Sequence, residues 1–128
     1  MTNDMENLYT DVALENPASR GVRAHVNGVL VSPNAAVSCF PAAVLEGLGV
    51  AREKRLHFQK PDGTLIERWT GAAILCAAGT CTIDDVVFGE PGDVVLLGAR
   101  SLTGLNRIVD PVTKSLVDAG PISAAAMA

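Results

Sequence analysis

The chain has 128 residues, of which 48% are hydrophobic, and its formal net charge at pH 7 is −4. This length suits one domain that buries about two-thirds of its unfolded surface around a single core. The Lys and Arg residues are scattered, so the sequence lacks the basic patch expected of a nucleic-acid-binding or membrane-surface protein. It also lacks an apolar run of about 18 residues, so no membrane-spanning helix is expected.

The first twenty residues, "MTNDMENLYTDVALENPASR", are polar and acidic and show no sustained hydrophobic period. They differ from a secretory signal, which has a basic start and an apolar middle, so we expect a cytoplasmic location. We expect residues 1–20 to form a flexible arm and residues 21–128 to form the folded domain. Three cysteines in a chain without a signal are interpreted as free thiols rather than a disulfide framework.

The first regular pattern is "GVRAHVNGVLVS", residues 21–32, in which two β-rich runs flank Asn27-Gly28. This dipeptide suits the positive φ angles of a tight turn, so a hairpin is predicted. Pro41 then begins "PAAVLEGL", residues 41–48, whose apolar residues fall on one helical face. A short helix is predicted there.

The rest of the chain alternates short β segments with turn residues, and one further helix is predicted in it. Pro61-Asp62-Gly63 favours a reversal of the chain, so the segment that contains it is predicted to be a second hairpin. The expected elements are a hairpin over 55–69, a strand pair over 70–78 and 80–88, a strand over 94–98, a helix over 99–106, and two short segments around Asp110-Pro111. Many short strands with only two short helices favour a mainly β barrel or sandwich.

The order of these segments resembles that of the retropepsin-like aspartic proteases, particularly their small bacterial single-domain members. The most similar stretch is "VVFGEPGDVVLLGARSLTGLNRIVDPVTKSLVDAGP", residues 86–121, in which an apolar strand ends in Leu-Leu-Gly before a short helix and an Asp-Pro turn. "FPAAVLEGLGV" resembles the helix after the family's catalytic loop, and "KPDGTLIER" resembles its flap hairpin. Over residues 20–122 the resemblance implies a closed antiparallel β barrel with two short helices.

The resemblance fails at the catalytic loop. Family members carry Asp-Thr-Gly, usually followed by Ala, where this chain has Ser32, Pro33 and Asn34, followed by Ala35. Aspartic proteases need two carboxyl groups that share one proton, and a dimer with Ser32 at both positions supplies neither. Pro33 also lacks the hydroxyl and the N–H with which the family's Thr bonds across the dimer axis. The segment is interpreted as a turn that keeps the loop's geometry without its chemistry, and a relocated active site is the alternative.

We therefore expect a catalytically inactive pseudoprotease that acts as a binding or assembly subunit, within a larger complex, with no cofactor and no metal. The alternative is a hydrolase that uses an unrecognised site without Asp. The candidate binding residues are Pro61, Asp62 and Gly63 at the flap tip, together with Trp69, which either anchors a partner or completes the core.

The resemblance also implies a homodimer. The tail "AGPISAAAMA", residues 119–128, has no charged side chain and suits a close-packed subunit interface. Because Pro33 removes the usual hydrogen bonds across the axis, this dimer should depend on the tail, and Pro33→Thr should change its association little.

The cysteines and histidines were weighed as alternative sites. Cys76 and Cys81 could face each other across a hairpin, but two cysteines alone do not complete a structural zinc site, so free thiols are expected. Cys39 has apolar neighbours and is expected to be a core residue with a raised thiol pKa. His25 and His57 lie in separate strand candidates and are expected to be surface or hydrogen-bonded strand residues.

The remaining carboxylates do not form a dyad in the sequence. Asp84 and Asp85 are adjacent in a predicted strand, so their side chains should point to opposite faces. Asp110 precedes a proline and is interpreted as a turn residue. The stretch "GEPGD" does not match a phosphate-binding P-loop, because no Gly-Lys-Ser/Thr follows it, and is interpreted as a loop that enters a buried strand.

Overall fold

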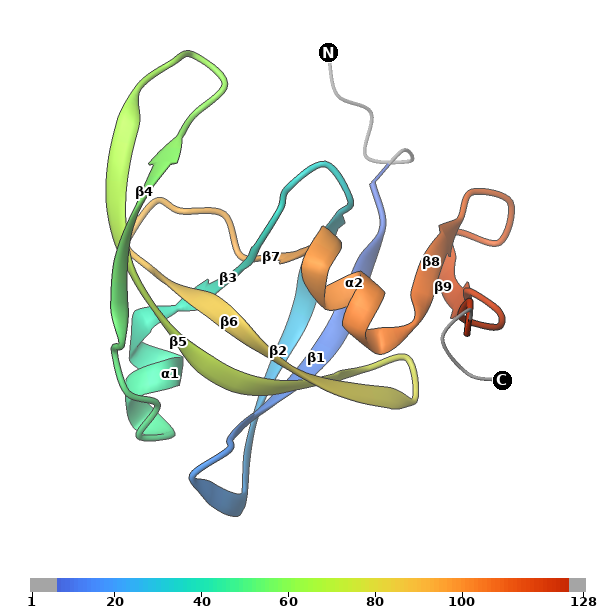
Figure 1. Ribbon diagram of the computed structural model, residues 1–128, viewed down its shortest axis with the longest axis horizontal. Coiled ribbons are helices and arrows are strands. Elements are labelled where there is room, and N and C mark those ends of the chain that lie inside the picture. The colour runs from blue at the N-terminus through green and yellow to red at the C-terminus, as the bar shows by residue number, and fades with distance from the viewer. Residues whose placement is uncertain (1–6, 125–128) are drawn as a thin grey trace.

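A computed structural model describes residues 7–124 of the chain and shows a mainly β protein with two short helices (Figure 1). The elements in chain order are β1 (Tyr9–Asn16), β2 (Ser19–Ser32), β3 (Ser38–Pro41), α1 (Ala42–Gly47), β4 (Lys54–Gln59), β5 (Leu65–Ala77), β6 (Thr80–Gly89), β7 (Leu96–Gly98), α2 (Ala99–Leu105), β8 (Arg107–Asp110) and β9 (Ser115–Asp118).

Seven strands form one sheet in the order β1-β2-β7-β3-β6-β5-β4, and β1 also pairs with β5. Most pairs are antiparallel, but β2 pairs with β7 in parallel, as does β3 with β6. The sheet is therefore mainly antiparallel, as expected, and the two parallel pairs are the exception to the antiparallel pattern. Parallel pairing is possible there because neither β2 and β7 nor β3 and β6 are joined by a hairpin, the connection that requires antiparallel neighbours.

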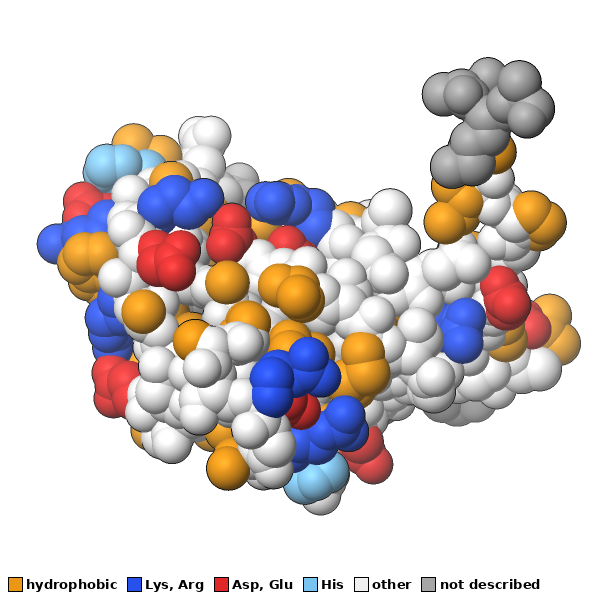
Figure 2. All heavy atoms as spheres, turned by 60° about the horizontal axis from the view of Figure 1, so that its bottom comes forward, with side chains coloured by type: hydrophobic (Ala, Val, Ile, Leu, Met, Phe, Trp, Pro, Cys, Tyr) orange, Lys and Arg blue, Asp and Glu red, His pale blue; other side chains and the backbone are white. Residues whose placement is uncertain are grey.

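The core lies between the sheet and the two helices. In β1 the alternation of strand side chains turns Val12 and Leu14 inward, and α2 turns Leu102 and Leu105 toward the same interior. The fully buried large side chains are Val12, Leu14, Val29, Phe40, Leu45, Leu75, Val86, Phe88, Leu97 and Leu105. On the outer face shown in Figure 2, hydrophobic, basic and acidic side chains are interspersed.

The prediction of a flexible arm over residues 1–20 is wrong for the segment that forms β1. Tyr9–Asn16 form β1, which pairs with both β2 and β5. The acidic residues obscured this strand in the sequence. Glu15 is only 4% exposed because Arg20 and Arg23 bind its carboxylate. Residues 1–6 of the predicted arm lie outside the described residues.

The predicted hairpin turn at Asn27-Gly28 is also wrong, because β2 runs through this dipeptide without reversing. The register shifts there: Thr10 pairs with Val29 but Val12 pairs with Val26, so β2 has one extra residue. Gly28 has φ +66° and donates its N–H to Asp11 Oδ1 at 2.9 Å. Asn27-Gly28 therefore forms a β-bulge, for which a residue with positive φ is equally suitable.

The reversal before β2 occurs instead at Pro17-Ala18, between β1 and β2. There Asn16 Oδ1 accepts the Ala18 N–H at 2.9 Å. An Asn side chain that caps its own turn, with Pro in the next position, is a common turn signal.

The other predicted elements are confirmed. Helix α1 spans Ala42–Gly47 and α2 spans Ala99–Leu105, while β4–β5 and β5–β6 are hairpins. Asp110 accepts the Val112 N–H at 2.9 Å and so begins the turn between β8 and β9, as expected. None of the helices within the described residues is long and apolar enough to cross a membrane.

The expectation of free thiols is wrong for two of the three cysteines. Cys76 of β5 and Cys81 of β6 form a disulfide, with their Cα atoms 4.0 Å apart. The two residues are direct partners across the antiparallel pair, which brings their Cβ atoms within bonding reach. An odd cysteine count favours free thiols, but the β5–β6 register places this pair directly opposite each other.

Candidate functional site

The loop predicted to be a degenerate catalytic loop begins where β2 ends. Ser32 pairs with Gly98 in the parallel β2–β7 ladder, and the Ala35 N–H donates to the Ser32 carbonyl at 3.1 Å to close a turn over Pro33 and Asn34. The side chains of Pro33 and Asn34 are exposed, and those of Ser32 and Ala35 are half-buried. The structural turn predicted from Pro and Asn is therefore confirmed.

The far side of this loop is bonded to the start of α2. The Ala99 N–H donates to the Ala35 carbonyl at 2.7 Å, and the Arg100 N–H donates to the Ala36 carbonyl at 3.2 Å. These bonds use helix N–H groups that have no partner inside α2. The conformation of the loop is therefore fixed by backbone bonds that do not depend on the side chains of Ser32, Pro33 or Asn34.

Gly98 lets the loop and the helix approach so closely. A Cβ atom at Gly98 would lie 2.5 Å from the Val37 carbonyl oxygen and 2.9 Å from that of Ala35, distances at which the backbone would have to move. The glycine that ends Leu96-Leu97-Gly98 is therefore required by packing between β7 and the loop.

A buried chain of hydroxyl groups continues from this point. The Gly98 N–H donates to Ser38 Oγ at 2.9 Å, Ser38 Oγ and Ser101 Oγ lie 2.7 Å apart, and Ser101 donates to Asp84 Oδ2 at 2.8 Å. Ser38 and Ser101 are both 0% exposed. Because Ser38 already accepts from Gly98 and Ser101 donates to the carboxylate, the Ser38 hydroxyl donates to Ser101.

This chain of hydroxyls cannot serve as a nucleophile–base pair for an external substrate. Neither serine reaches solvent, and the Asp84 carboxylate binds a hydroxyl that is itself buried. The expected separation of the adjacent carboxylates is confirmed, since Asp85 instead bonds Lys54 at 3.1 Å. Sequence reasoning missed the Ser38–Ser101–Asp84 network because its members are 63 and 17 positions apart in the chain.

The candidate loop itself contains no acid or base. Positions 32–36 are Ser, Pro, Asn, Ala and Ala, and no residue from 7 to 124 provides a hydrogen-bonded base for the Ser32 hydroxyl. A serine hydroxyl needs such a base before it can attack a carbonyl near neutral pH. The arrangement provides an ordered surface turn rather than general acid–base chemistry.

The predicted hairpin is formed by β4 and β5. Lys60 and Thr64 close its tip by an N–H···O bond of 2.8 Å, and Asp62 accepts the Thr64 N–H at 2.8 Å. This bond holds the pKa of Asp62 below its usual value. Gly63 has φ +89°. Pro61, Asp62 and Gly63 are exposed at the tip, which lies at the same end of the molecule as the loop after β2 (Figure 1).

Trp69 does not lie with these tip residues. It occupies the base of the hairpin, packs against the core cluster, and has the Arg55 guanidinium 5.5 Å above its ring. The six strand positions from Gly63 to Trp69 correspond to roughly 20 Å. Of the two interpretations of Trp69, the structure supports completion of the core.

An apolar groove of about 540 Å³ lies beside the loop. It is lined by Pro33, by Leu102 of α2, by Ile108 of β8 and by Ile122 of the tail, among others. Ile108 is 52% exposed and Ile122 is 76% exposed, although both side chains are hydrophobic. The groove therefore joins the loop, α2 and the described part of the tail into one apolar surface.

The GEPGD loop packs beside Cys39, and within it the Glu90 N–H donates to Asp93 Oδ2 at 2.8 Å. Arg68 holds it through two bonds to Asp93, of 2.7 and 2.9 Å. The Arg68 guanidinium holds the pKa of Asp93 below its usual value. Cys39 is buried next to this loop, and burial raises the pKa of its thiol to about 11, as the sequence predicted.

The two histidines lie apart in the structure. His25 is exposed on β2, and His57 on β4 lies 3.1 Å from Glu67, which also binds Arg55. Among residues 7–124, no three His, Cys, Asp or Glu side chains lie together as a metal site would require.

Comparison with models of known protein families and with curated protein sequences finds no match to this chain. The functional argument therefore depends on the geometry of the loop, the groove and the hairpin.

Proposed function

We propose that this chain is a catalytically inactive, retropepsin-like pseudoprotease that acts as a binding or assembly subunit. The observation that carries the proposal is the loop of residues 32–36. Backbone hydrogen bonds from the start of α2 hold this loop in place, yet the loop contains no carboxylate. A loop that keeps an ordered conformation without an acid or base suits binding rather than hydrolysis.

Three further features support the retropepsin-like assignment. The pairing of β1 with β5 connects the first and sixth strands of the sheet order, as a closed barrel requires. The apolar strand β7 ends in Leu96-Leu97-Gly98 and leads directly into α2. The β4–β5 hairpin extends beyond the paired part of β6, as a flap would. Order and connectivity of the elements thus agree with the resemblance.

Hydrolysis of peptides tests the absence of catalysis. The purified chain should not cleave unstructured peptides at acidic or neutral pH, because two Ser32 hydroxyls cannot share a dyad proton. Cleavage that is lost in Ser32→Ala and is retained by a matched surface variant, Ser115→Ala, would overturn the proposal and favour an active site without Asp.

We also propose that the subunit forms a symmetric homodimer through the apolar groove beside Pro33. Exposed Ile108 and Ile122 are costly to leave in water, and the groove would bury them against a second copy. Since Pro33 has no N–H or side-chain donor, apolar burial must supply most of the association free energy.

Sedimentation velocity at micromolar concentration tests the dimer. Deletion of residues 119–128 and the groove variant Ile108→Lys should each weaken association, whereas Pro33→Thr should change it little. Val22→Lys is the matched control, because Val22 is a 65% exposed hydrophobic residue that does not line the groove. A wild-type chain that sediments as a monomer would refute the homodimer, and an unchanged dimer after the tail deletion would refute the role of the tail.

A further inference from the structure

The disulfide between Cys76 and Cys81 is not used by the proposed function and lies outside the core. Its neighbours along β5, Leu75 and Ala77, turn inward and are 0% and 6% exposed. Cys81 is exposed and Cys76 is half-buried, so the sulfur atoms lie on the outer face of the sheet. Reagents in solution can therefore reach Cys81 without opening the fold.

The β5–β6 hairpin does not need this bond to hold its register. Its antiparallel ladder runs without interruption from Thr70↔Val87 to Ala77↔Thr80, and the bond joins residues only five positions apart. A disulfide that closes so short a loop contributes only about 2 kcal/mol through loop-closure entropy, less than one that closes a long loop. The exposed position of the sulfur atoms therefore suggests a role beyond this modest stabilisation.

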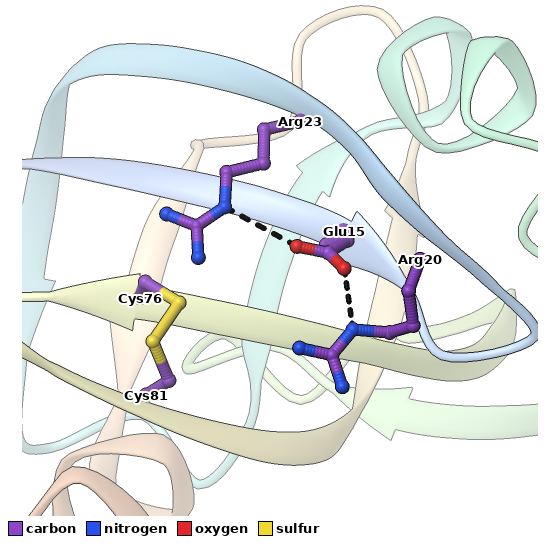
Figure 3. The surroundings of a disulfide bond; sticks show 5 residues. All are labelled: Glu15, Arg20, Arg23, Cys76 and Cys81. Atoms are coloured by element: carbon purple, nitrogen blue, oxygen red, sulfur yellow. Dashed lines mark hydrogen bonds and ion pairs between the residues drawn. A yellow bond between two sulfur atoms is a disulfide. The ribbon is translucent and has the colours of Figure 1, made fainter.

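A hollow with side chains of both charges lies beside the disulfide. A depression of about 440 Å³ is lined by both cysteines, Arg23, His25 and Asp11, among others. Figure 3 shows the Arg23 guanidinium on the same side of the sheet as the sulfur atoms. Arg23 is the cation of this lining and Asp11 is its anion, whose carboxylate accepts the Gly28 N–H at 2.9 Å.

The position of Arg23 is fixed by Glu15. Arg23 Nε donates to Glu15 Oε1 at 3.2 Å, and Arg20 donates to the other carboxylate oxygen. The bond from Arg20, followed by the Gly21 N–H, holds the pKa of Glu15 below its usual value, so the carboxylate stays ionised near neutral pH. Two guanidinium groups share one carboxylate, so Glu15 does not fully neutralise Arg23 (Figure 3).

We propose that Cys76–Cys81 is an exchangeable disulfide and that the hollow beside it is a reaction site for small thiols. A positive charge next to a cysteine stabilises its thiolate and makes it a better leaving group in exchange. An exposed disulfide of this kind is reduced more readily than one buried in a core. The inference does not depend on the retropepsin-like assignment.

The reaction consists of two exchange steps. The thiolate of the incoming thiol attacks Cys81 Sγ, a new S–S bond forms between them, and the Cys76–Cys81 bond breaks. The electron pair of the broken bond remains on Cys76 Sγ as a thiolate beside Arg23. A second thiolate then attacks the sulfur of the bound thiol, releases a small-molecule disulfide, and leaves both cysteines reduced after Cys81 and Cys76 take up protons from water.

The experiment measures reduction of the folded, full-length chain by reduced glutathione and, separately, by dithiothreitol. Newly formed thiols are trapped by alkylation and counted by mass spectrometry. Both reagents should reduce the wild type while its far-UV circular dichroism stays unchanged. Arg23→Gln should slow reduction by both reagents about tenfold, because the leaving thiolate loses its cation.

Arg20→Gln is the matched control, because Arg20 binds the same carboxylate but does not line the hollow. Its rate should stay within about twofold of the wild type, and Arg23→Lys, which keeps the charge, should be faster than Arg23→Gln. The variant Cys76→Ser, treated with oxidised glutathione, should gain one glutathione at Cys81. Cys76→Ser keeps the proposal testable if Arg23→Gln fails to fold, and the absence of a glutathione adduct at Cys81 would then contradict it.

Three results would overturn the proposal. The first is a wild-type disulfide that resists millimolar glutathione until the chain is unfolded. The second is unfolding that accompanies reduction, which would make the bond structural. The third is equal slowing by Arg20→Gln and Arg23→Gln, which would remove the assigned role of Arg23.

Discussion

Removal of the Ser38 hydroxyl should destabilise the protein more than its small size suggests. In Ser38→Ala the buried Gly98 N–H loses its acceptor, and Ser101 loses the donor that lies 2.7 Å away. A buried donor left without a partner costs about 1–3 kcal/mol. We therefore expect the free energy of unfolding to fall by about 2 kcal/mol, with the chain still folded.

Ser101→Ala should cost a similar amount, about 2 kcal/mol, because the buried Ser38 hydroxyl loses its acceptor and Asp84 loses a donor, although the Gly98 N–H keeps its bond to Ser38. The double variant should cost less than the sum of the two single variants, since both remove the same Ser38–Ser101 bond. The matched control is Ser115→Ala. It breaks a hydroxyl pair of the same length, 2.7 Å, formed with Thr113 on the surface, and should cost under about 0.5 kcal/mol.

Urea denaturation followed by circular dichroism measures these differences. With a slope of about 2 kcal/mol per molar urea, Ser38→Ala should lower the midpoint by roughly 1 M and leave the slope unchanged. A shift no larger than that of Ser115→Ala would refute the argument, because it would show that Gly98 finds another acceptor.

Two further predictions concern groups whose pKa is shifted. The pKa of Asp93 is lowered chiefly by its bonds to Arg68, so its ionised form stabilises the fold above its unfolded pKa of about 3.9, and this contribution is lost as the pH falls through the folded pKa. Arg68→Met should therefore lower the urea midpoint at pH 7. When the pH falls from neutral to about 3, the variant should lose less additional stability than the wild type, and equal acid sensitivity in both proteins would contradict this. Cys39, whose thiol pKa is raised to about 11 by burial, should resist iodoacetamide in the folded chain near pH 8 and react once urea unfolds it; rapid alkylation without unfolding would show that the thiol is accessible.

Local turn chemistry predicted much of the fold. Pro61-Asp62-Gly63 and the residues around Gly79 marked real hairpins, and the short helices begin and end within two residues of their predicted limits. These elements depend on residues that are close in the chain, so their signals are visible without knowledge of the tertiary structure.

The errors arose where the pairing of one strand with another decides the outcome. β1 looked like a polar arm because the two arginines that neutralise Glu15 come from the next strand. Asn27-Gly28 fits both a turn and a bulge, and only the continued pairing of β2 with β1 distinguishes them. The disulfide depends on the β5–β6 register, because a shift of one residue would no longer place Cys76 opposite Cys81.

The candidate site shows the same division. The missing carboxylate and the turn over Pro33 and Asn34 could be predicted from sequence because both are properties of consecutive residues. The buried Ser38–Ser101–Asp84 chain and the apolar groove could not, because each joins segments far apart in the sequence.

The placement of β1 between two strands has a consequence for synthesis of the protein. Ala13 pairs with His25 on one side and with Cys76 on the other, so its second neighbour is translated much later than its first. At roughly 5–20 residues per second, the nascent chain carries an open β1 edge for several seconds. During this interval Val12 and Leu14 lack their final cover, and the edge can pair with another chain. A low expression temperature, which slows aggregation, and a general chaperone, which protects the open edge, are therefore expected to raise the yield of soluble protein. Changes to the β8–β9 hairpin should raise it less.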